Sequence, residues 1–366
     1  MTAGNTPPAG ARPAHMTIAI ASFQRRQKLL RLLRGLDAQL AANAELRRGV
    51  SIVVVLDGST DGSRDVVHAE TWSVPVRVLW QPNRGLAAAR NAGLSAAKGG
   101  VVWFLDDDVV PSAGLVERHR RAHPSGDPTI VVGPCRVPPE ADGPPEVRQW
   151  WAEFDQRLFD EEIIDRYDRF TAANASGPAT SFVEVGGFDE RLSSYGLEDY
   201  ELAVRLLAAG VPIRVDRDAV AWHPDLESVA THVVRERGIG ENAARIVQWH
   251  PHTAELLFPD RPMSPSRRLL RGLHLRRPGP LMVASRVALT ASRLLSWLPG
   301  PARRAEHLAG TAAYAAGVSS VDRSGALLER VLGPNSEPSR RWRGSSRRSS
   351  RHPRRRPTSK DVTISR

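Results

Sequence analysis

The sequence predicts an α/β fold in which a mostly parallel sheet is flanked by helices. Two observations carry this prediction. From residue 16 onward, short apolar runs with the composition of buried strands alternate with segments of helical spacing. Polar side chains then follow four of these strands directly or closely. Because strands that alternate with helices form right-handed crossovers, their carboxyl ends share one edge, and ligands of open α/β sheets bind beyond that edge.

Four strands and three helices are expected at the start of this alternation. The strands are short runs rich in β-branched residues, at residues 17–21, 51–56, 76–80 and 101–105. The helices lie between them, at residues 24–40, 62–70 and 86–97. The first helix carries leucines at helical spacing, and the third is an alanine-rich run that ends before two glycines.

Shorter elements are expected to complete the sheet. A helix at residues 114–123 and a strand at residues 129–132 precede a proline-rich loop. An amphipathic helix begins near Glu198, and short strands follow at residues 213–215 and 219–222. From there to about residue 332 the pattern is mostly helical, which predicts a C-terminal helical extension.

The net charge of +11 is concentrated at the C-terminus. Residues 339–366 contain eleven Lys or Arg and one Asp, so this tail holds ten of the eleven net charges. The body is nearly neutral, which argues against a nucleic-acid-binding surface. We predict a disordered N-terminus over residues 1–15, a sheet domain over residues 16–225, a helical region over residues 226–334 and a disordered tail over residues 335–366.

Three features predict a cytoplasmic protein. Residues 1–15 lack the apolar stretch of a signal peptide, and no window of 18 residues is uninterruptedly apolar. The single cysteine, Cys135, excludes an intramolecular disulfide and a cysteine-based zinc site. The basic tail also suits a peripheral contact with the anionic inner face of a membrane.

Residues 281–298 form an amphipathic helix on a helical wheel. One face is apolar and the opposite face carries serines: Val283, Val287, Leu294 and Leu298 against Ser285, Ser292 and Ser296. Such a helix either docks on protein or lies in a membrane interface. Because most amphipathic helices face a core, we expect the apolar face to dock on the body.

An aromatic segment also has two interpretations. Trp150, Trp151, Phe154 and Phe159 are interleaved with acidic residues. Such a segment either holds a sugar ring beside a cleft or forms a lid packed on the body. We favour the lid.

Three carboxylates, Asp106, Asp107 and Asp108, follow the strand at residues 101–105. Adjacent ionised carboxylates repel, and burying them unpaired is costly. Hard divalent ions such as Mg²⁺ and Mn²⁺ bind carboxylate oxygens, and Mg²⁺ usually shares its coordination shell with substrate phosphates. The three residues therefore indicate either a cation site or an Asp-rich turn before Pro111.

The other three strands decide between these interpretations. Ser22, Asp57 and Asn83 each follow a strand directly or closely. In a parallel sheet these residues share an edge with the three aspartates. Four polar clusters at one edge favour a ligand site over four unrelated turns.

The sequence resembles the family-2 glycosyltransferases, which have the GT-A fold with a Rossmann-like, mostly parallel sheet. Residues 17–25, 53–61, 83–93 and 104–108 carry the likeness. A fifth segment, residues 186–190 followed by Glu198 and Asp199, resembles the acceptor side of the family. The likeness covers residues 16–223 and leaves the C-terminal helices and the tail outside it.

The resemblance implies a donor site for a nucleotide sugar. Ser22 and Asp57 occupy positions where the family contacts the donor base and ribose, and Asn83 belongs to the same site. Asp106, the first residue of the Asp-x-Asp motif, faces the ribose. Leu56 stands where the family often has another aspartate, and Ala21 where it often has proline. The donor is therefore left open between UDP-, GDP- and dTDP-sugars.

The resemblance also implies a metal and a base. Asp108 completes the Asp-x-Asp motif and binds Mn²⁺ or Mg²⁺, and His223 occupies the position of a metal-binding histidine. Asp199 matches the catalytic base. Position alone does not choose between Glu198 and Asp199, since a helix dipole favours carboxylates at either. His223 is equally compatible with a structural role.

Together, the donor site, the metal and the base that the resemblance implies would carry out an inverting transfer of a sugar. A divalent ion neutralises the departing diphosphate, and one positioned carboxylate activates the hydroxyl of a glycan, lipid-linked or small-molecule acceptor. A nucleotidyltransferase is the alternative enzyme, but residues 21–25 contain none of the glycines that hold a triphosphate. A binding protein that acts through the tail is the alternative without catalysis.

Overall fold

The computed structural model describes residues 15–97, 100–124, 127–141, 148, 151–153, 155–156, 162–226, 228–259, 263–273 and 275–332. Apart from His15, the residues predicted as a disordered N-terminus and a disordered tail lie outside these ranges. So do Trp150, Phe154 and Phe159 of the aromatic segment.

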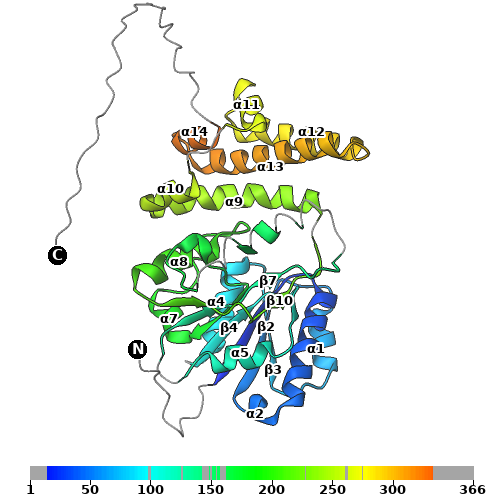
Figure 1. Cartoon of the computed structure of the whole chain (residues 1–366), viewed down its shortest axis with the longest axis vertical. Helices are drawn as coiled ribbons and strands as arrows, with labels where there is room; N and C mark the ends of the chain where they lie inside the picture. Colours follow the sequence, from blue (N-terminus) through cyan, green and yellow to red (C-terminus); the bar gives the residue numbers. More distant parts are fainter. Residues whose placement is uncertain are drawn as a thin grey trace, which may run out of the picture.

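A seven-stranded sheet forms the core, in the order β3-β2-β1-β4-β8-β6-β9 (Figure 1). All neighbouring strands are parallel except β8, which runs antiparallel to β4 and β6. The predicted α/β fold is confirmed, and its first four predicted strands correspond to β1–β4. The strands are β1 (Met16–Ser22), β2 (Val50–Asp57), β3 (Val76–Gln81), β4 (Val101–Leu105), β6 (Ile130–Val132), β8 (Asn174–Pro178) and β9 (Ile213–Val215).

A second, three-stranded sheet has the order β5-β10-β7. It consists of β5 (Val110–Pro111), β10 (Ala221–Trp222) and β7 (Cys135–Arg136). The predicted strand at residues 219–222 is thus shorter than expected. One of its strands, β5, begins two residues after Asp108, and another, β10, ends directly before His223. The small sheet therefore joins two parts of the predicted site.

Helices cover both faces of the large sheet. On one face α1 (Arg26–Ala42), α3 (Ser63–Ala69) and α5 (Leu115–Arg121) bury leucine and valine side chains against the sheet. On the other face α4 (Leu86–Ala96), α7 (Ala179–Glu184) and α8 (Glu198–Ala208) pack against alternate strand residues such as Ala19 and Phe104. The short α2 (Ala44–Arg47) follows α1. The alternation of strand side chains between two cores is why β1 is mostly apolar and β4 is apolar throughout.

β8 was not predicted because its sequence, Asn-Ala-Ser-Gly-Pro, contains no apolar run. Its polar side chains are buried with partners. Trp103 Nε1 donates to Asn174 Oδ1 at 3.0 Å, and His119 Nε2 lies 2.9 Å from the same oxygen. Ser176 Oγ lies 2.7 Å from His119 Nδ1 and 2.6 Å from His123 Nε2. The Ser176 hydroxyl can donate its proton to one of these ring nitrogens and accept a proton from the other, so both histidines have a partner here as neutral rings.

Stability is expected to fall as the pH drops below about 6.5 because of these two histidines. Burial lowers the pKa of His119 to about 3 and that of His123 to about 4. The unfolded chain, with ordinary histidine pKa values, then binds more protons than the folded chain, at a cost of up to ~1.4 kcal/mol per pH unit for each histidine. Urea unfolding at pH 7.5 and pH 5.0 measures this loss. A His119→Gln/His123→Asn variant should lose less stability over the same interval; an equally steep loss would contradict the assignment.

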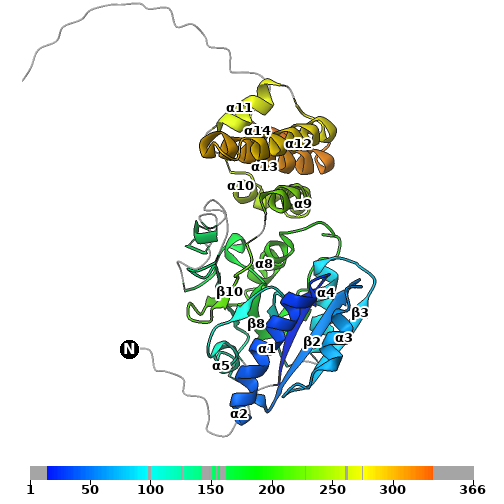
Figure 2. The same ribbon diagram turned by 90° about the vertical axis from the view of Figure 1, so that its right-hand side faces the viewer.

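The C-terminal region is a stack of helices on one end of the sheet domain (Figures 1 and 2). α9 (Val229–Trp249) lies next to the sheet domain, α13 (Pro299–Val321) lies on α9, and α12 (Pro278–Leu294) lies on α13. Two glycines let α9 and α13 approach closely, because a Cβ at Gly240 would lie 2.2 Å from Tyr314 O and one at Gly317 would lie 2.0 Å from Arg237 O. The remaining helices are α10 (Ala254–Leu257), α11 (Pro265–Gly272) and α14 (Ala326–Leu332), with 3₁₀ turns at Tyr167–Arg169 and Pro251–Thr253. None of the helices within the described ranges is long and apolar enough to span a bilayer.

The expected orientation of α12 is wrong. Its serine face is the buried one: Ser285 Oγ donates to Ala309 O at 2.9 Å, and Ser292 Oγ donates to Glu306 Oε1 at 2.9 Å. Val283, Val287 and Leu294 instead point away from the protein and are 60–72% exposed. α12 docks on the alanine-rich surface of α13 through Leu281, Ser285, Ala288 and Ser292, which leaves Val283, Val287 and Leu294 outside.

Candidate active site

The structure places the predicted residues at one edge of the large sheet. Ser22 is the last residue of β1, Asp57 is the last residue of β2, and Asp106 follows β4 directly. β1 is parallel to both β2 and β4, so these three ends lie at the same edge. Asn83 lies exposed on the loop after β3, which continues the same parallel set.

Arg25 holds two of the three aspartates. Its Nη1 donates to Asp107 Oδ1 and to Asp108 Oδ2, each at 2.8 Å. Burial raises the pKa of Asp107 to about 6, although Arg25 opposes this rise, and Ser22 lies beside the same carboxyl. The loop after β1 therefore supplies a cation to the Asp-x-Asp segment, and the sequence prediction had given Arg25 no role.

His223 lies against Asp108. Its Nε2 is 3.4 Å from Asp108 Oδ2, and its Nδ1 is buried without a hydrogen-bond partner. Burial alone would raise the pKa of Asp108, but the hydrogen bond and charge of His223, with Arg25, hold that pKa below its usual range. Trp151 packs on the His223 ring with centroids 4.7 Å apart, which fits the lid interpretation for this residue.

The donor set of these residues fits a divalent ion. A carboxylate and an imidazole are already adjacent, and the Asp106 carboxylate, whose side chain is 36% exposed, stands two residues away along the chain. Oxygen and imidazole ligands suit Mn²⁺. In the arrangement described, Asp108 is paired with Arg25, and no cluster of three or more His, Cys, Asp or Glu side chains in the described part of the chain is gathered for metal binding.

Arg90 of α4 links the sheet edge that carries Asp106 to α8. Its Nη2 donates to Asp106 Oδ1 at 2.9 Å, and its Nη1 donates to Glu198 Oε1 at 2.7 Å. Arg90 and Glu198 are 6% and 4% exposed, so their charges are buried together. Arg90 lies in residues 83–93, one of the segments that carry the family resemblance, but the sequence indicated no partner for it.

Glu198 and Asp199 differ in their surroundings. Glu198 is neutralised by Arg90, whereas Asp199 accepts a hydrogen bond from Tyr200 N at 2.9 Å. Burial, followed by the nearby charge of Glu198, raises the pKa of Asp199 to about 7 even though Arg90 opposes the rise. A carboxylate that titrates near neutral pH is suited to accept and release a proton.

The C-terminal helices position the start of α8. Asn242 Nδ2 of α9 donates to Ser194 O at 2.9 Å and to Gly196 O at 2.7 Å. The next residue, Leu197, has a left-handed backbone with φ 68°, a strained conformation for leucine. α9 thus holds the turn from which Glu198 and Asp199 project, so the helical region supports the site.

The carboxylate of Asp57 accepts hydrogen bonds from the end of β3 and from the loop that follows it. Its Oδ1 accepts from Gln81 Nε2 at 2.8 Å and from Arg84 N at 2.9 Å, and its Oδ2 accepts from Gly85 N at 2.9 Å. This carboxylate therefore shapes the loop that carries Asn83 and leads into α4. A direct contact between Asp57 and the donor stays a prediction.

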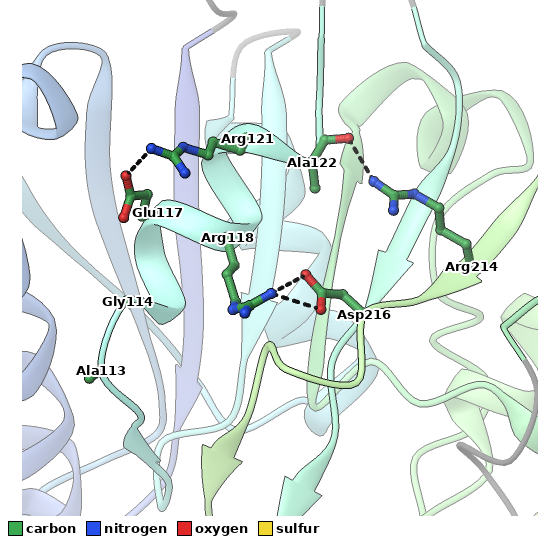
Figure 3. Close-up of a pocket in the computed structure, with 8 residues that line it drawn as sticks. All are labelled: Ala113, Gly114, Glu117, Arg118, Arg121, Ala122, Arg214 and Asp216. Carbon is green, nitrogen blue, oxygen red and sulfur yellow. Dashed lines mark hydrogen bonds and ion pairs between the residues drawn. The ribbon is translucent and has the colours of Figure 1, made fainter. Parts of the chain in front are cut away.

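One surface pocket of about 500 Å³ lies elsewhere, between α5 and β9 (Figure 3). Its arginines are already occupied: Arg118 pairs with Asp216, Arg121 pairs with Glu117, and Arg214 donates to Ala122 O. None of the predicted site residues lines this pocket. It is therefore separate from the candidate active site and offers no unpaired cation for an anionic ligand.

Comparison with known proteins identifies the family. Residues 17–182 match the family model described as glycosyl transferase family 2. These residues, which make up most of the sheet domain, belong to glycosyl transferase family 2. Residues 159–219 also match the model described as the N-terminal domain of galactosyltransferase, and this region contains Asp199 and the turn before it. The matched segments contain the predicted site residues except His223.

Two relatives among characterised glycosyltransferases share this domain. Validoxylamine A glucosyltransferase of Streptomyces hygroscopicus subsp. jinggangensis is 30% identical over 271 residues, covering 66% of this chain and 63% of the relative. Pre-mycofactocin glycosyltransferase of Mycobacterium tuberculosis is 30% identical over 261 residues, covering 69% of this chain and 52% of the relative. The chain thus spans less than two thirds of the length of either relative.

A solved structure confirms the GT-A fold. The mannosyltransferase PcManGT from Pyrobaculum calidifontis, in complex with GDP-Man and Mn²⁺, superimposes with a TM-score of 0.54 at 17% identity. The alignment covers 87% of this chain and 90% of the mannosyltransferase. At this identity the likeness concerns the fold, which in this chain includes the helices beyond the sheet domain.

Proposed function

We propose that the chain is an inverting glycosyltransferase that moves a sugar from a nucleoside diphosphate donor to an acceptor hydroxyl. The observation that carries the proposal is the Arg90 bridge, which joins Asp106 of the Asp-x-Asp segment to Glu198 of α8, the residue before Asp199. It brings a diphosphate-binding edge and a proton acceptor to one site, as a single in-line displacement requires. The glucosyltransferase relative supports the same reaction class.

In this mechanism Asp199 accepts the proton of the acceptor hydroxyl as the oxygen attacks the anomeric carbon. Its raised pKa makes it a stronger base than an exposed aspartate while it still ionises near pH 7. Glu198 remains paired with Arg90 and contributes through its charge. Arg90 fixes the distance between the base and Asp106, which faces the donor ribose.

Asp108 and His223 would hold a Mn²⁺ or Mg²⁺ ion, with Asp106 beside it. Such an ion, when bound, neutralises the charge that develops on the departing diphosphate. Arg25 balances the charge of Asp107 and Asp108 in the arrangement described, so donor binding must displace or reorient part of this ion pair. Ser22, Asp57 and Asn83 are proposed to line the base and ribose side.

The donor is a UDP-, GDP- or dTDP-sugar and the acceptor is a glycan, a lipid-linked sugar or a small molecule. The glucosyltransferase relative and the GDP-Man-bound structure of similar fold support a nucleotide-sugar donor without choosing its base. We propose a cytoplasmic protein whose basic tail contacts anionic membrane peripherally. None of the proposed site residues belongs to the tail, so we expect transfer to a soluble acceptor not to depend on it.

Replacing Asp108 by Ala is expected to remove the metal-dependent part of donor binding and leave the fold intact. Thermal shift with UDP-, GDP- and dTDP-sugars, with and without Mn²⁺ or Mg²⁺, measures this. Asp218→Ala is the matched control, because Asp218 is a surface aspartate whose side chain is 73% exposed. An Asp108→Ala variant whose donor-induced shift still responds to the metal as wild type does would refute the assignment.

A further inference from the structure

α12 presents an outward apolar stripe that nothing else in the described structure covers. Val283 and Val287 are four residues apart and Leu294 follows seven residues later, so these three share one face of the helix, and Trp297 lies in the turn that follows it. The exposed fractions are 60% for Val283, 64% for Val287, 72% for Leu294 and 75% for Trp297. Single exposed apolar residues are ordinary, but several of them gathered on one helix face mark an interaction surface.

The position of α12 in the stack turns this stripe to the outside of the molecule. α12 packs on α13, and α13 packs on α9, which is the helix next to the sheet domain (Figures 1 and 2). The buried serines hold α12 in this orientation through hydrogen bonds to α13. The stripe is therefore fixed on the side of the helical stack that faces away from the catalytic domain.

The neighbouring α11 adds to the same kind of surface. Leu269 is 48% exposed and Leu273, which directly follows the helix, is 56% exposed, while Leu270 is buried. Figure 2 shows α11 and α12 together at the end of the molecule farthest from the sheet domain. Two helical segments thus expose leucine, valine and tryptophan side chains at one end.

The segment of the chain that forms these two helices carries charge of a single sign. Between Asp260 and Glu306 the sequence contains ten arginines and no Asp or Glu. Arg286 and Arg293 are exposed next to the apolar stripe of α12, and Arg268 is exposed on α11. The body as a whole is nearly neutral, because acidic residues elsewhere in the sequence compensate for the charge of these arginines.

We propose that α11 and α12 bind the surface of an anionic phospholipid bilayer, with the stripe of α12 lying in the headgroup region. An amphipathic helix with arginines beside Leu, Val and Trp side chains has the composition of an interfacial helix. A second copy of this chain is disfavoured as the occupant, since it would bring the same arginines against these. The basic tail is disfavoured for the same reason. This surface goes beyond the proposed transfer reaction and does not depend on it.

A fluorescent label on the stripe tests the proposal. The only cysteine, Cys135, is buried, so a Leu294→Cys variant of the full chain can be labelled selectively with a polarity-sensitive dye. With vesicles of phosphatidylcholine and phosphatidylglycerol we expect a blue shift and an intensity gain, and with pure phosphatidylcholine no change. The matched control is Glu184→Cys on the exposed part of α7, where the dye should respond to neither vesicle.

Both labelled proteins carry the basic tail, so both can bind vesicles through it. The dye response at residue 294 distinguishes binding through α12 from binding through the tail alone. Sedimentation with the anionic vesicles without a dye response at residue 294 would show that the tail alone binds, and would overturn the proposal. So would no sedimentation at all. A dye response at residue 294 that grows with protein concentration in the absence of vesicles would identify a second copy as the occupant instead.

The arginines provide a second test on the unlabelled chain. An Arg286→Ser/Arg293→Ser variant should bind the anionic vesicles roughly 30-fold more weakly, since each basic residue near a membrane contributes about fivefold. The matched control is Arg47→Ser/Arg48→Ser, which removes the same charge from an exposed site at the end of α2. Equal weakening in the two variants would show that only net charge matters and would contradict a surface on α12.

Discussion

Replacing Asp199 by Asn is expected to lower turnover roughly 10²–10⁴-fold, the usual contribution of a general base. The amide has the same shape but cannot accept the proton of the acceptor hydroxyl. Donor affinity should hardly change, because Asp199 belongs to the acceptor side. Steady-state turnover and donor titration of the variant and the wild type measure both effects. Near-normal turnover of Asp199→Asn would exclude it as the base.

The pH dependence adds a second readout of the same assignment. The base must be ionised, so kcat/KM should rise with pH through about 7, the pKa of Asp199. In a Glu198→Gln variant the rise should move to lower pH, because the charge of Glu198 is one cause of the raised pKa. An unchanged profile in Glu198→Gln would contradict the electrostatic role given to this residue. An inactive Glu198→Gln with an active Asp199→Asn would make Glu198 the base.

Replacing Arg90 by Met is expected to destabilise the fold by about 3–5 kcal/mol, the usual cost of breaking a buried ion pair by removing one partner. Glu198, 4% exposed, would keep its charge without a partner, and Asp106 would lose its contact as well. Urea unfolding measures the change in the free energy of unfolding.

Arg84→Met is the matched control for this prediction. Arg84 pairs with Glu190, but the two side chains are 59% and 39% exposed. Exposed pairs contribute about 0–1 kcal/mol, so this variant should stay close to the wild type. If Arg90→Met were as stable as Arg84→Met, the bridge between α4 and α8 would not hold the site together.

The sequence predicted those parts of the fold whose side chains follow a regular period. β1, β2 and β4 are mostly apolar runs, and the leucines of α1 recur at helical spacing, so these elements were expected before the structure. β8 escaped prediction because burial of Asn174 and Ser176 depends on histidines more than 50 residues away. A short-range pattern does not contain such a partner.

The features of the site likewise divide into those that the sequence predicted and those that it did not. The end of each strand predicted where Asp57 and Asp106 would lie. The partners of the charged groups were not predictable, since Arg90 and Glu198 are 108 residues apart in the chain.

The helical wheel likewise separated Ser285 and Ser292 from Val283, Val287 and Leu294 but could not tell which face would be buried. That choice depends on the small residues that α13 presents to α12. Ser296 and Leu298, also placed on the wheel, lie beyond the end of α12, and Ser296 is exposed.

The most direct test of the central claim is release of nucleoside diphosphate from UDP-, GDP- and dTDP-sugars by the full chain. We predict release from at least one donor in the presence of Mn²⁺ or Mg²⁺, abolished by EDTA and restored by added metal. Folded protein that releases no nucleoside diphosphate from any of these sugars would contradict the account, as would release that EDTA leaves unchanged.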